Sequence, residues 1–435
     1  MEVSRERGRL TAALATLPSG TIPVGAGLLV NGVATYVFQI LAFRMLGSVD
    51  YAALNGLWVT TVVLAPGLFL PLEQEVARAL AHRKARGQGG RPLIITALGF
   101  STLLVLGVVA VLLLARSPIE ERLLRSADEL FPALIIVLVG FAIMSLARGT
   151  LSGNGRFGRY GIIVGMDGLG RAVLAAGLAF LGFATLGWLG LVFAVVPYIA
   201  VLFGLAGARG LAEPGPPAPV SELSTAIGWL LLGSTFAQAL SYSAYIGASL
   251  LASPAQNAAL GAFIAGIFIA RIPLLLFQAV QAALLPKLAG LLGEGRVQEF
   301  RTGLFRLVVI VLGASVVGVL VALTIAPAIG RVLFGENFTL TGVSLATLTA
   351  GVCLMVTALT LAQALIALRR YAVTALAWVA SVAVFVVIML LVDVDIFVKA
   401  ELAFVAGAAV ALVWMGTVAY RATSGSELAQ HSAHP

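Results

Sequence analysis

Apolar runs of about 20 residues recur along almost the whole chain, and they constrain its fold more than any other feature. A helix of that length crosses about 30 Å of hydrocarbon. The chain is 60% hydrophobic and 11% charged, whereas soluble domains carry roughly 25% charged residues. We therefore predict an all-α multi-pass membrane protein. Its twelve predicted spans are residues 22–43, 52–77, 93–115, 129–148, 160–182, 185–207, 223–250, 257–284, 303–326, 340–367, 371–392 and 396–420.

The basic residues are distributed unequally between alternate loops. Nineteen of the 27 lysines and arginines lie on the side of the two termini, and six lie in the opposite loops. Basic loops stay in the cytoplasm. We therefore predict a protein of the cytoplasmic membrane with both termini cytoplasmic and with the first apolar run retained as a span. The two remaining bases, Arg171 and Arg271, fall inside spans.

The net charge of +8 does not indicate a nucleic-acid partner, because the bases are scattered over short loops between apolar runs. Cys353 is the only cysteine, so there is no disulfide framework and no zinc spacing. His82, His431 and His434 fall in a loop or in the tail, where solvation is the default. We predict no metal site and no cofactor.

A proline-rich break divides the chain into two halves of six spans. The segment "ARGLAEPGPPAPVSE" has no apolar periodicity and is typical of a semi-extended linker. The halves also echo each other: "DYAALNGL" resembles "NAALGAF", "EERLLRS" faces "IGRVLFG", and "GRYGIIV" faces "RRYAVTA", all at nearly constant offset. Six spans per half give both halves one orientation, which predicts parallel repeats related by a pseudo-twofold axis along the membrane normal. The predicted units are a first lobe (1–207), a cytoplasmic linker (208–222), a second lobe (223–420) and a cytoplasmic tail (421–435).

Four segments carry a resemblance to a known family. They are "FRMLGSVDYAALNGL" (43–57), "GNGRFGRYGIIV" (153–164), "ARIPLLLFQAVQAALLPKLAGLLGEGRVQEFR" (270–301) and "RVLFGENF" (331–338). Together with the span count, they resemble the polysaccharide-transporter (Wzx-like) branch of the multidrug/oligosaccharidyl-lipid/polysaccharide (MOP) flippase superfamily.

That resemblance implies a MATE-like pair of six-helix lobes that opens alternately to each side of the membrane. It implies a transporter, not an enzyme, which moves polyprenyl-diphosphate-linked oligosaccharide for cell-surface polysaccharide biosynthesis. The polyprenyl tail would stay among membrane lipids while the sugar and diphosphate cross a polar, often cationic, cavity. Coupling to H⁺ or Na⁺ and partnership with a glycosyltransferase or a polymerase are implied in the same way.

The fifth span holds an acid and a base, Asp167 and Arg171, in the order and i, i+4 spacing that favour an ion pair on one helix face. An ionisable group near the bilayer centre costs about 2.5–3.5 kcal/mol on the insertion scale, so it faces a partner or a wet cavity. Two interpretations stay open. The pair either fixes the span against its neighbours, or Arg171 faces the lumen and binds the substrate's diphosphate while Asp167 tunes that contact.

Arg271 lies mid-span in "IFIARIPLLLF", two residues before Pro273 and with no acid within a turn. Such a base needs a partner on another helix, a cavity or a ligand, and the proline can bend the helix and free carbonyl groups. We hypothesise that Arg171 and Arg271 face one cavity and offer a diphosphate one cation from each lobe.

Three further side chains are weaker candidates. Glu73, near the cytoplasmic end of the second span, is a candidate for a gate or for a coupling proton. Arg44, at the outer end of the first span, is a loop anchor or part of the outer mouth. Gln278 is one of several polar side chains inside spans that either bond between helices or line a sugar-sized cavity.

Two other classes of protein fit the sequence less well. A MATE-like drug/cation antiporter would place acids in the membrane, and Asp167 alone lies deep. A membrane polysaccharide polymerase or ligase needs positioned catalytic groups on a substantial outer loop. The longest outer connection, residues 116–128, offers no nucleophile paired with a base.

Overall fold

The computed structural model describes residues 21–219, 227–275, 277, 288, 291, 294, 296–336 and 338–424, and these residues are helical or lie in short connections. The apolar runs form helices because a backbone in hydrocarbon must satisfy its hydrogen bonds internally. The elements are α2 (Thr21–Ala85), α3 (Arg91–Leu114), α4 (Arg116–Pro118), η1 (Ile119–Leu123), α5 (Leu130–Gly153), α6 (Phe157–Phe180), α7 (Leu186–Leu205), α8 (Ile227–Ser241), α9 (Ser243–Leu251), η3 (Pro254–Gln256), α10 (Asn257–Ala270), α12 (Val297–Thr324), α13 (Ala326–Phe334), α14 (Gly342–Ala367), α15 (Tyr371–Leu391) and α16 (Ile396–Ser424).

The long helix α2 reverses direction at Gly47. This residue has φ 72° and ψ 176°, a conformation that glycine adopts without steric penalty. Tyr36 and Trp58 lie on opposite sides of Gly47, and both rings contact Phe268, at centroid distances of 6.3 and 5.0 Å. In a straight helix Tyr36 and Trp58 would be about 33 Å apart. The two halves of α2 therefore lie side by side as a hairpin.

The predicted span pattern is confirmed over the described residues. Ten of the helices there are long and apolar enough to cross a membrane. Helix α2 contains the first two predicted spans, and α8 with α9 forms the seventh. The protein is thus a multi-pass membrane protein of all-α class.

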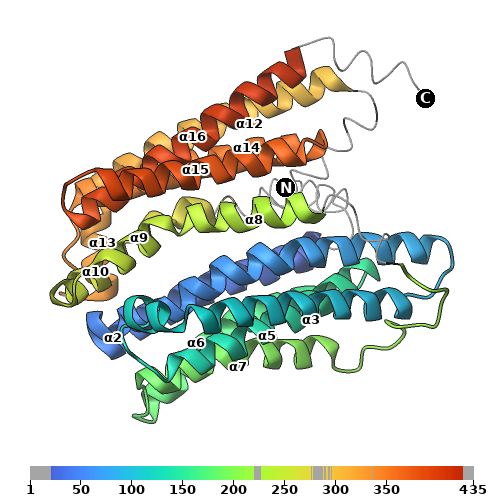
Figure 1. The fold of residues 1–435 in the computed structure, drawn as a ribbon, viewed down its shortest axis with the longest axis horizontal. Helices are drawn as coiled ribbons and strands as arrows, with labels where there is room; N and C mark the ends of the chain where they lie inside the picture. The colour runs from blue at the N-terminus through green and yellow to red at the C-terminus, as the bar shows by residue number, and fades with distance from the viewer. Residues whose placement is uncertain are drawn as a thin grey trace, which may run out of the picture.

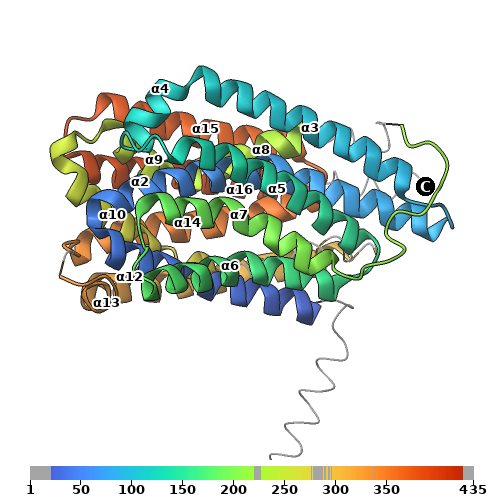
Figure 2. The ribbon, with the colours of Figure 1, turned by 90° about the horizontal axis from the view of Figure 1, so that it is seen from below.

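The helices form two lobes (Figure 1), the N-terminal lobe from α2 to α7 and the C-terminal lobe from α8 to α16. Helix α2 is the central element, because it packs against α5 and α6 in its own lobe and against α8 and α10 in the other. In each lobe the third span, α3 or α12, exposes most of its surface and leads into a short helix, α4 or α13. Figure 2 shows α4 and α13 at opposite edges of the molecule, as parallel repeats require.

The connections between the helices lie at the two ends of the bundle. We call the end with Gly47 and residues 115–129, 252–256 and 335–341 the kink end, and the end with residues 86–90, 154–156 and 206–219 the basic end. Most of the helices run from one end to the other, and the kink end is on the left in Figure 1.

The described part of the proline-rich segment, residues 208–219, lies against the N-terminal lobe. Arg83, near the end of α2, donates to the carbonyl oxygens of Pro216 and Pro217 at 2.9 and 3.0 Å. The Thr96 hydroxyl donates to Ala218 at 2.9 Å. The predicted linker is therefore docked rather than free along this stretch, and residues 220–226 lie outside the described residues, as does most of the predicted tail.

Small residues bring α2 and α6 into backbone contact. A Cβ atom on Gly27 would lie 2.4 Å from the carbonyl oxygen of Gly161, and one on Gly161 would lie 2.2 Å from that of Pro23. Such contact is typical of membrane helices, where dispersion forces replace the hydrophobic effect between helices.

We expect Gly27→Ala to destabilise the N-terminal lobe, because the new methyl group forces α2 and α6 apart. Overpacking of this kind costs about 1–3 kcal/mol. Gly25→Ala is the matched control, since a Cβ atom there meets nothing within 4 Å. Unfolding of the purified protein by titration with a denaturing detergent measures both variants. Equal midpoints for the two would contradict the close contact.

Candidate functional site

The predicted pair in the fifth span forms within α6. The Arg171 guanidinium donates to the Asp167 carboxylate at 2.5 Å, and both side chains are buried. The cation also lies over the Phe193 ring of α7, 4.5 Å from its centroid, and near the Phe141 ring of α5 at 5.8 Å. Asp167 lies about 15 Å along α6 from its start, close to the middle of the membrane.

A second ion pair lies toward the basic end. Arg148 of α5 donates to the Glu73 carboxylate of α2 at 2.6 and 2.9 Å. The Tyr160 hydroxyl of α6 donates to the other carboxylate oxygen at 2.9 Å. Three helices of the N-terminal lobe therefore converge on Glu73. Arg148 is one of the nineteen bases that the charge count places in loops on the side of the termini, and that prediction is wrong for this residue, which lies within α5 with a side chain that is 16% exposed.

The two ion pairs interact with each other. Arg148 interacts electrostatically with Asp167 as well as with Glu73, so two acids and two bases form one neutral network inside the N-terminal lobe. The expected cavity shared by Arg171 and Arg271 is not formed in this conformation. Arg171 is enclosed by α5, α6 and α7, whereas Arg271 contacts α8.

Arg271 lies between the lobes. It follows the last residue of α10 and is about 21 Å from the start of that helix, near mid-membrane. Its guanidinium donates to the carbonyl and hydroxyl oxygens of Ser241 at 2.9 and 3.0 Å and stacks 3.7 Å from the centroid of the Tyr242 ring. The side chain is half-buried, and none of the described acids forms an ion pair with it.

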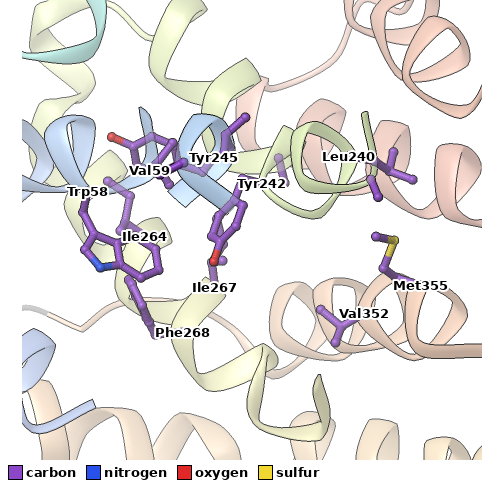
Figure 3. Close-up of a cluster of buried hydrophobic side chains, with 14 of the residues drawn as sticks. Trp58, Val59, Leu240, Tyr242, Tyr245, Ile264, Ile267, Phe268, Val352 and Met355 are labelled. Atoms are coloured by element: carbon purple, nitrogen blue, oxygen red, sulfur yellow. The ribbon is translucent and has the colours of Figure 1, made fainter. Parts of the chain in front are cut away.

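Aromatic side chains form the wall next to this cation. Figure 3 shows Trp58 of α2 facing Tyr242, which lies between α8 and α9, and Phe268 of α10. The Trp58 ring lies 5.5 Å from that of Tyr242 and 5.0 Å from that of Phe268. The Tyr36 hydroxyl donates to the carbonyl oxygen of Phe268 at 3.0 Å, just before the helix breaks at Arg271. The lobe interface thus combines a cation, hydroxyl groups and aromatic faces at mid-membrane depth.

Arginines of the N-terminal lobe join the two lobes at the kink end, and Arg44 and Arg125 make the shortest of these contacts, while Arg122 donates to Leu250 at 3.4 Å. Arg44 of α2 donates to the carbonyl oxygens of Val332 and Leu333 at 2.6 and 2.7 Å, in the last turn of α13. Arg125, just after η1, donates to the carbonyl oxygen of Ser249 in α9 at 2.9 Å. Cations are favourable at helix C-termini, where carbonyl groups lack partners. We call Arg44 and Arg125 with these carbonyl groups the kink-end contacts.

Arg125 is held in an uncommon conformation. Its φ of 53° lies in the left-handed region that non-glycine residues seldom occupy, and partial burial lowers the pKa of its guanidinium. In the sequence Arg125 is one of the six bases of the outer loops. Gln278, a sequence candidate for the cavity, lies outside the described residues.

One buried acid, Glu401, is not among the candidate residues chosen from the sequence. Glu401 of α16 is 4% exposed, and its Oε1 atom has no hydrogen-bond partner among the described residues. The sequence signal was present, since this glutamate falls inside the predicted span 396–420. Its position could have singled it out, because the nearest base in the sequence, Lys399, is two residues away and not at the i±3 or i±4 spacing of a helical ion pair.

The known sequences that resemble this chain are uncharacterized proteins. No protein-family model matches the chain. An uncharacterized protein of Mycobacterium tuberculosis is 25% identical over 381 residues, covering 86% of each chain, and an uncharacterized protein of Mycobacterium bovis matches equally.

Solved structures show the fold. A crystal structure of MATE in complex with MaL6 superposes with a TM-score of 0.68 at 16% identity, covering 94% of this chain and 96% of that one. An inward-facing multidrug resistance MATE transporter of the MOP superfamily gives 0.67 at 15% identity, covering 98% and 99%. A MOP superfamily transporter from Pyrococcus furiosus, described as having a binding pocket of reverse polarity, gives 0.57 at 16% identity, covering 92% and 94%. The chain therefore has the fold of MATE/MOP transporters.

We expect Arg148→Ala to destabilise the protein by about 3–5 kcal/mol, because it leaves the buried Glu73 carboxylate without its cation. The double variant Glu73→Gln with Arg148→Ala should recover part of that loss. Arg296→Ala is the control, since its two ion pairs are solvent-exposed and should add no measurable stability. Detergent-induced unfolding measures all three, and a loss no larger for Arg148→Ala than for the control would contradict a buried network.

We expect Arg125→Ala to separate the lobes at the kink end. Loss of a hydrogen bond from a charged donor is worth about 1.5–3 kcal/mol, which raises the population of separated lobes roughly tenfold or more. Spin labels at exposed Ser117 and Val394, in a Cys353→Ala background, report the distance by pulsed electron resonance. Arg116→Ala is the control, because Arg116 pairs with Glu120 in its own lobe. Distance distributions that do not change would refute the role of this contact.

Proposed function

We propose that this chain moves a polyprenyl-diphosphate-linked oligosaccharide across the cytoplasmic membrane by alternating access, for cell-surface polysaccharide biosynthesis. The MATE/MOP fold supports transport between two lobes, and the residues between those lobes support the substrate class. Glycosyltransferases or a polymerase would act before and after the transported molecule. The basic end would face the cytoplasm, following the distribution of lysines and arginines.

Arg271 is the observation that carries this proposal. It is a mid-membrane cation at the lobe interface, held by neutral oxygen atoms of Ser241 and by the Tyr242 ring rather than by a described acid. A base so placed can exchange weak neutral partners for an anion, and a planar guanidinium suits the oxygen atoms of a diphosphate.

The surrounding aromatic side chains fit the sugar part of the same molecule. Trp58 and Tyr242 present apolar ring faces with polar edges, which suit sugar rings that have both apolar faces and hydroxyl groups. Both side chains are buried in this conformation. Binding of substrate therefore requires the lobes to separate around Arg271.

A drug/cation antiporter is the second candidate, since the fold neighbours include multidrug resistance transporters. Such a transporter would bind a cation with an acid. In the described residues the deep acids of the N-terminal lobe, Glu73 and Asp167, each form an ion pair with an arginine. For the Pyrococcus furiosus transporter, the reverse polarity of the binding pocket is described as suggesting a different function.

Coupling to a proton or sodium gradient is part of the proposal, and Glu73 is its first candidate residue. Its carboxylate binds Arg148 and Tyr160 and so joins α2, α5 and α6. Protonation would remove the charge that holds Arg148, loosening the contact between these helices. Asp167 and Arg171 would respond through the electrostatic link to Arg148.

The test is transport in proteoliposomes loaded with a fluorescent polyprenyl-diphosphate disaccharide, with accessibility to an external glycosidase as the readout. We expect Arg271→Ala to slow transport at least tenfold and Arg271→Lys to slow it less, because lysine keeps the charge without the bidentate geometry. Arg301→Ala, at an exposed position of α12, is the control.

A lipophilic fluorescent cation tests the second candidate in the same vesicles. Efflux of that cation, with no transport of the lipid-linked sugar by the wild type, would replace the proposal by the antiporter. Equal sugar transport by Arg271→Ala and the wild type would remove Arg271 from the path.

A further inference from the structure

Glu401 differs from every other buried acid in the described residues. Four acidic side chains are buried there, namely Glu73, Glu75, Asp167 and Glu401. The first three form ion pairs with Arg148, Arg78 and Arg171. Among the residues that the structure describes, Glu401 forms no ion pair, and its Oε1 atom has no hydrogen-bond partner.

The surroundings of Glu401 contain little charge. Helix α16 packs against α8, α9, α14 and α15, and none of these four helices contains an aspartate, glutamate, lysine or arginine. Ser344 of α14 is the neighbouring hydrogen-bonding group, and Asp395, before α16, is a nearby charge of like sign. Lys399 is two residues earlier on α16, and the helix repeat of about 100° per residue places it on the opposite side of that helix from Glu401. Asp395 is itself occupied as the cap of α16, accepting from Phe397 and Val398.

Two influences on the carboxyl group oppose each other. Burial without a cation penalises the ionised form. The N-terminus of α14, which begins at Gly342 beside Ser344, favours a negative charge through its free N–H groups. The two influences offset each other, so the Glu401 carboxyl group can be either protonated or ionised, as a site that exchanges protons requires.

A path for the proton leads to the kink end. The Thr341 hydroxyl, which is exposed, lies 3.4 Å from the Ser344 hydroxyl, and Ser344 adjoins Glu401. Glu401 lies only about 8 Å along α16 from the helix start. Two hydroxyl groups thus connect the buried carboxyl group with the surface.

We propose that Glu401 is a proton-binding site of the C-terminal lobe, loaded from the kink end through Thr341 and Ser344. The proton goes from water to the carboxylate, and no other group changes its charge. One turn away, the Phe397 ring packs 5.1 Å from that of Phe263 in α10, and α10 touches the α2 hairpin where Gly261 meets Ser48. Proton binding therefore acts where the two lobes are joined. This link to transport rests on the proposed function, but the proton site does not.

Infrared difference spectroscopy of the purified full chain in lipid nanodiscs tests the site without a transport assay. Between about pH 6 and pH 9 exposed carboxyl groups are already ionised. We expect a carboxylic C=O band that disappears as the pH rises, is absent in Glu401→Gln and persists in Glu299→Gln, whose carboxylate is exposed on α12. A band retained in Glu401→Gln, or no band in the folded wild type, overturns the proposal.

Three further measurements complete the test. At a fixed pH, sodium chloride and choline chloride should give the same band. A band that is lost only in sodium chloride would mean that the site binds a metal cation and not a proton. Should Glu401→Gln fail to fold, Glu401→Asp should shift the band, and an unshifted band counts against the site. In vesicles, Glu401→Gln should lower transport driven by a pH gradient at least tenfold. If the wild type transports nothing, the proposed function fails while the spectrum still decides the site.

Discussion

Hydrocarbon gives no solvation to charge, and this constraint explains where each ionisable side chain of the molecule lies. In the N-terminal lobe the acids and bases neutralise one another, as Glu73 with Arg148 and Asp167 with Arg171. Pairs of this kind add little net stability but are costly to break, so they fix which helices are neighbours. Arg271 and Glu401 are not neutralised in this way. Both lie in the C-terminal lobe, where a ligand or a proton can complete their surroundings.

The kink-end contacts follow the internal repeat of the fold. In each lobe the short helical segment after the third span, which is α4 with η1 in the N-terminal lobe and α13 in the C-terminal lobe, touches the end of the first span in the other lobe, through η1 with α9 and through α13 with α2. Each contact is made by an arginine of the N-terminal lobe, which is Arg44 at α13 and Arg125 at α9. Their acceptors are backbone carbonyl groups, so the contacts do not depend on an acid in the opposite lobe. Hydrogen bonds of this type can be exchanged for water when the lobes part.

The sequence was sufficient for the fold and for local pairs, but not for contacts between distant segments. Span positions follow from apolar length, and the pairing of Asp167 with Arg171 follows from the helix repeat. Arg148 is 75 residues from Glu73, and no periodicity relates them. A count of basic residues by loop therefore assigned Arg148 to the surface. Whether Arg171 and Arg271 share a cavity could not be derived from the sequence for the same reason, since Arg171 contacts the distant residues Phe141 and Phe193 in this conformation.

The reversal at Gly47 also affects how the chain enters the bilayer. The first two spans are continuous helix on either side of one left-handed glycine, with no hydrophilic loop between them. Neither half offers a separate segment that could be translocated first, and the second half depends on the first for its partners at Phe43 and Tyr51, whose rings lie 5.0 Å apart. The first two spans are therefore one helical hairpin with a single glycine as its turn, so a change at Gly47 alters the placement of both spans together.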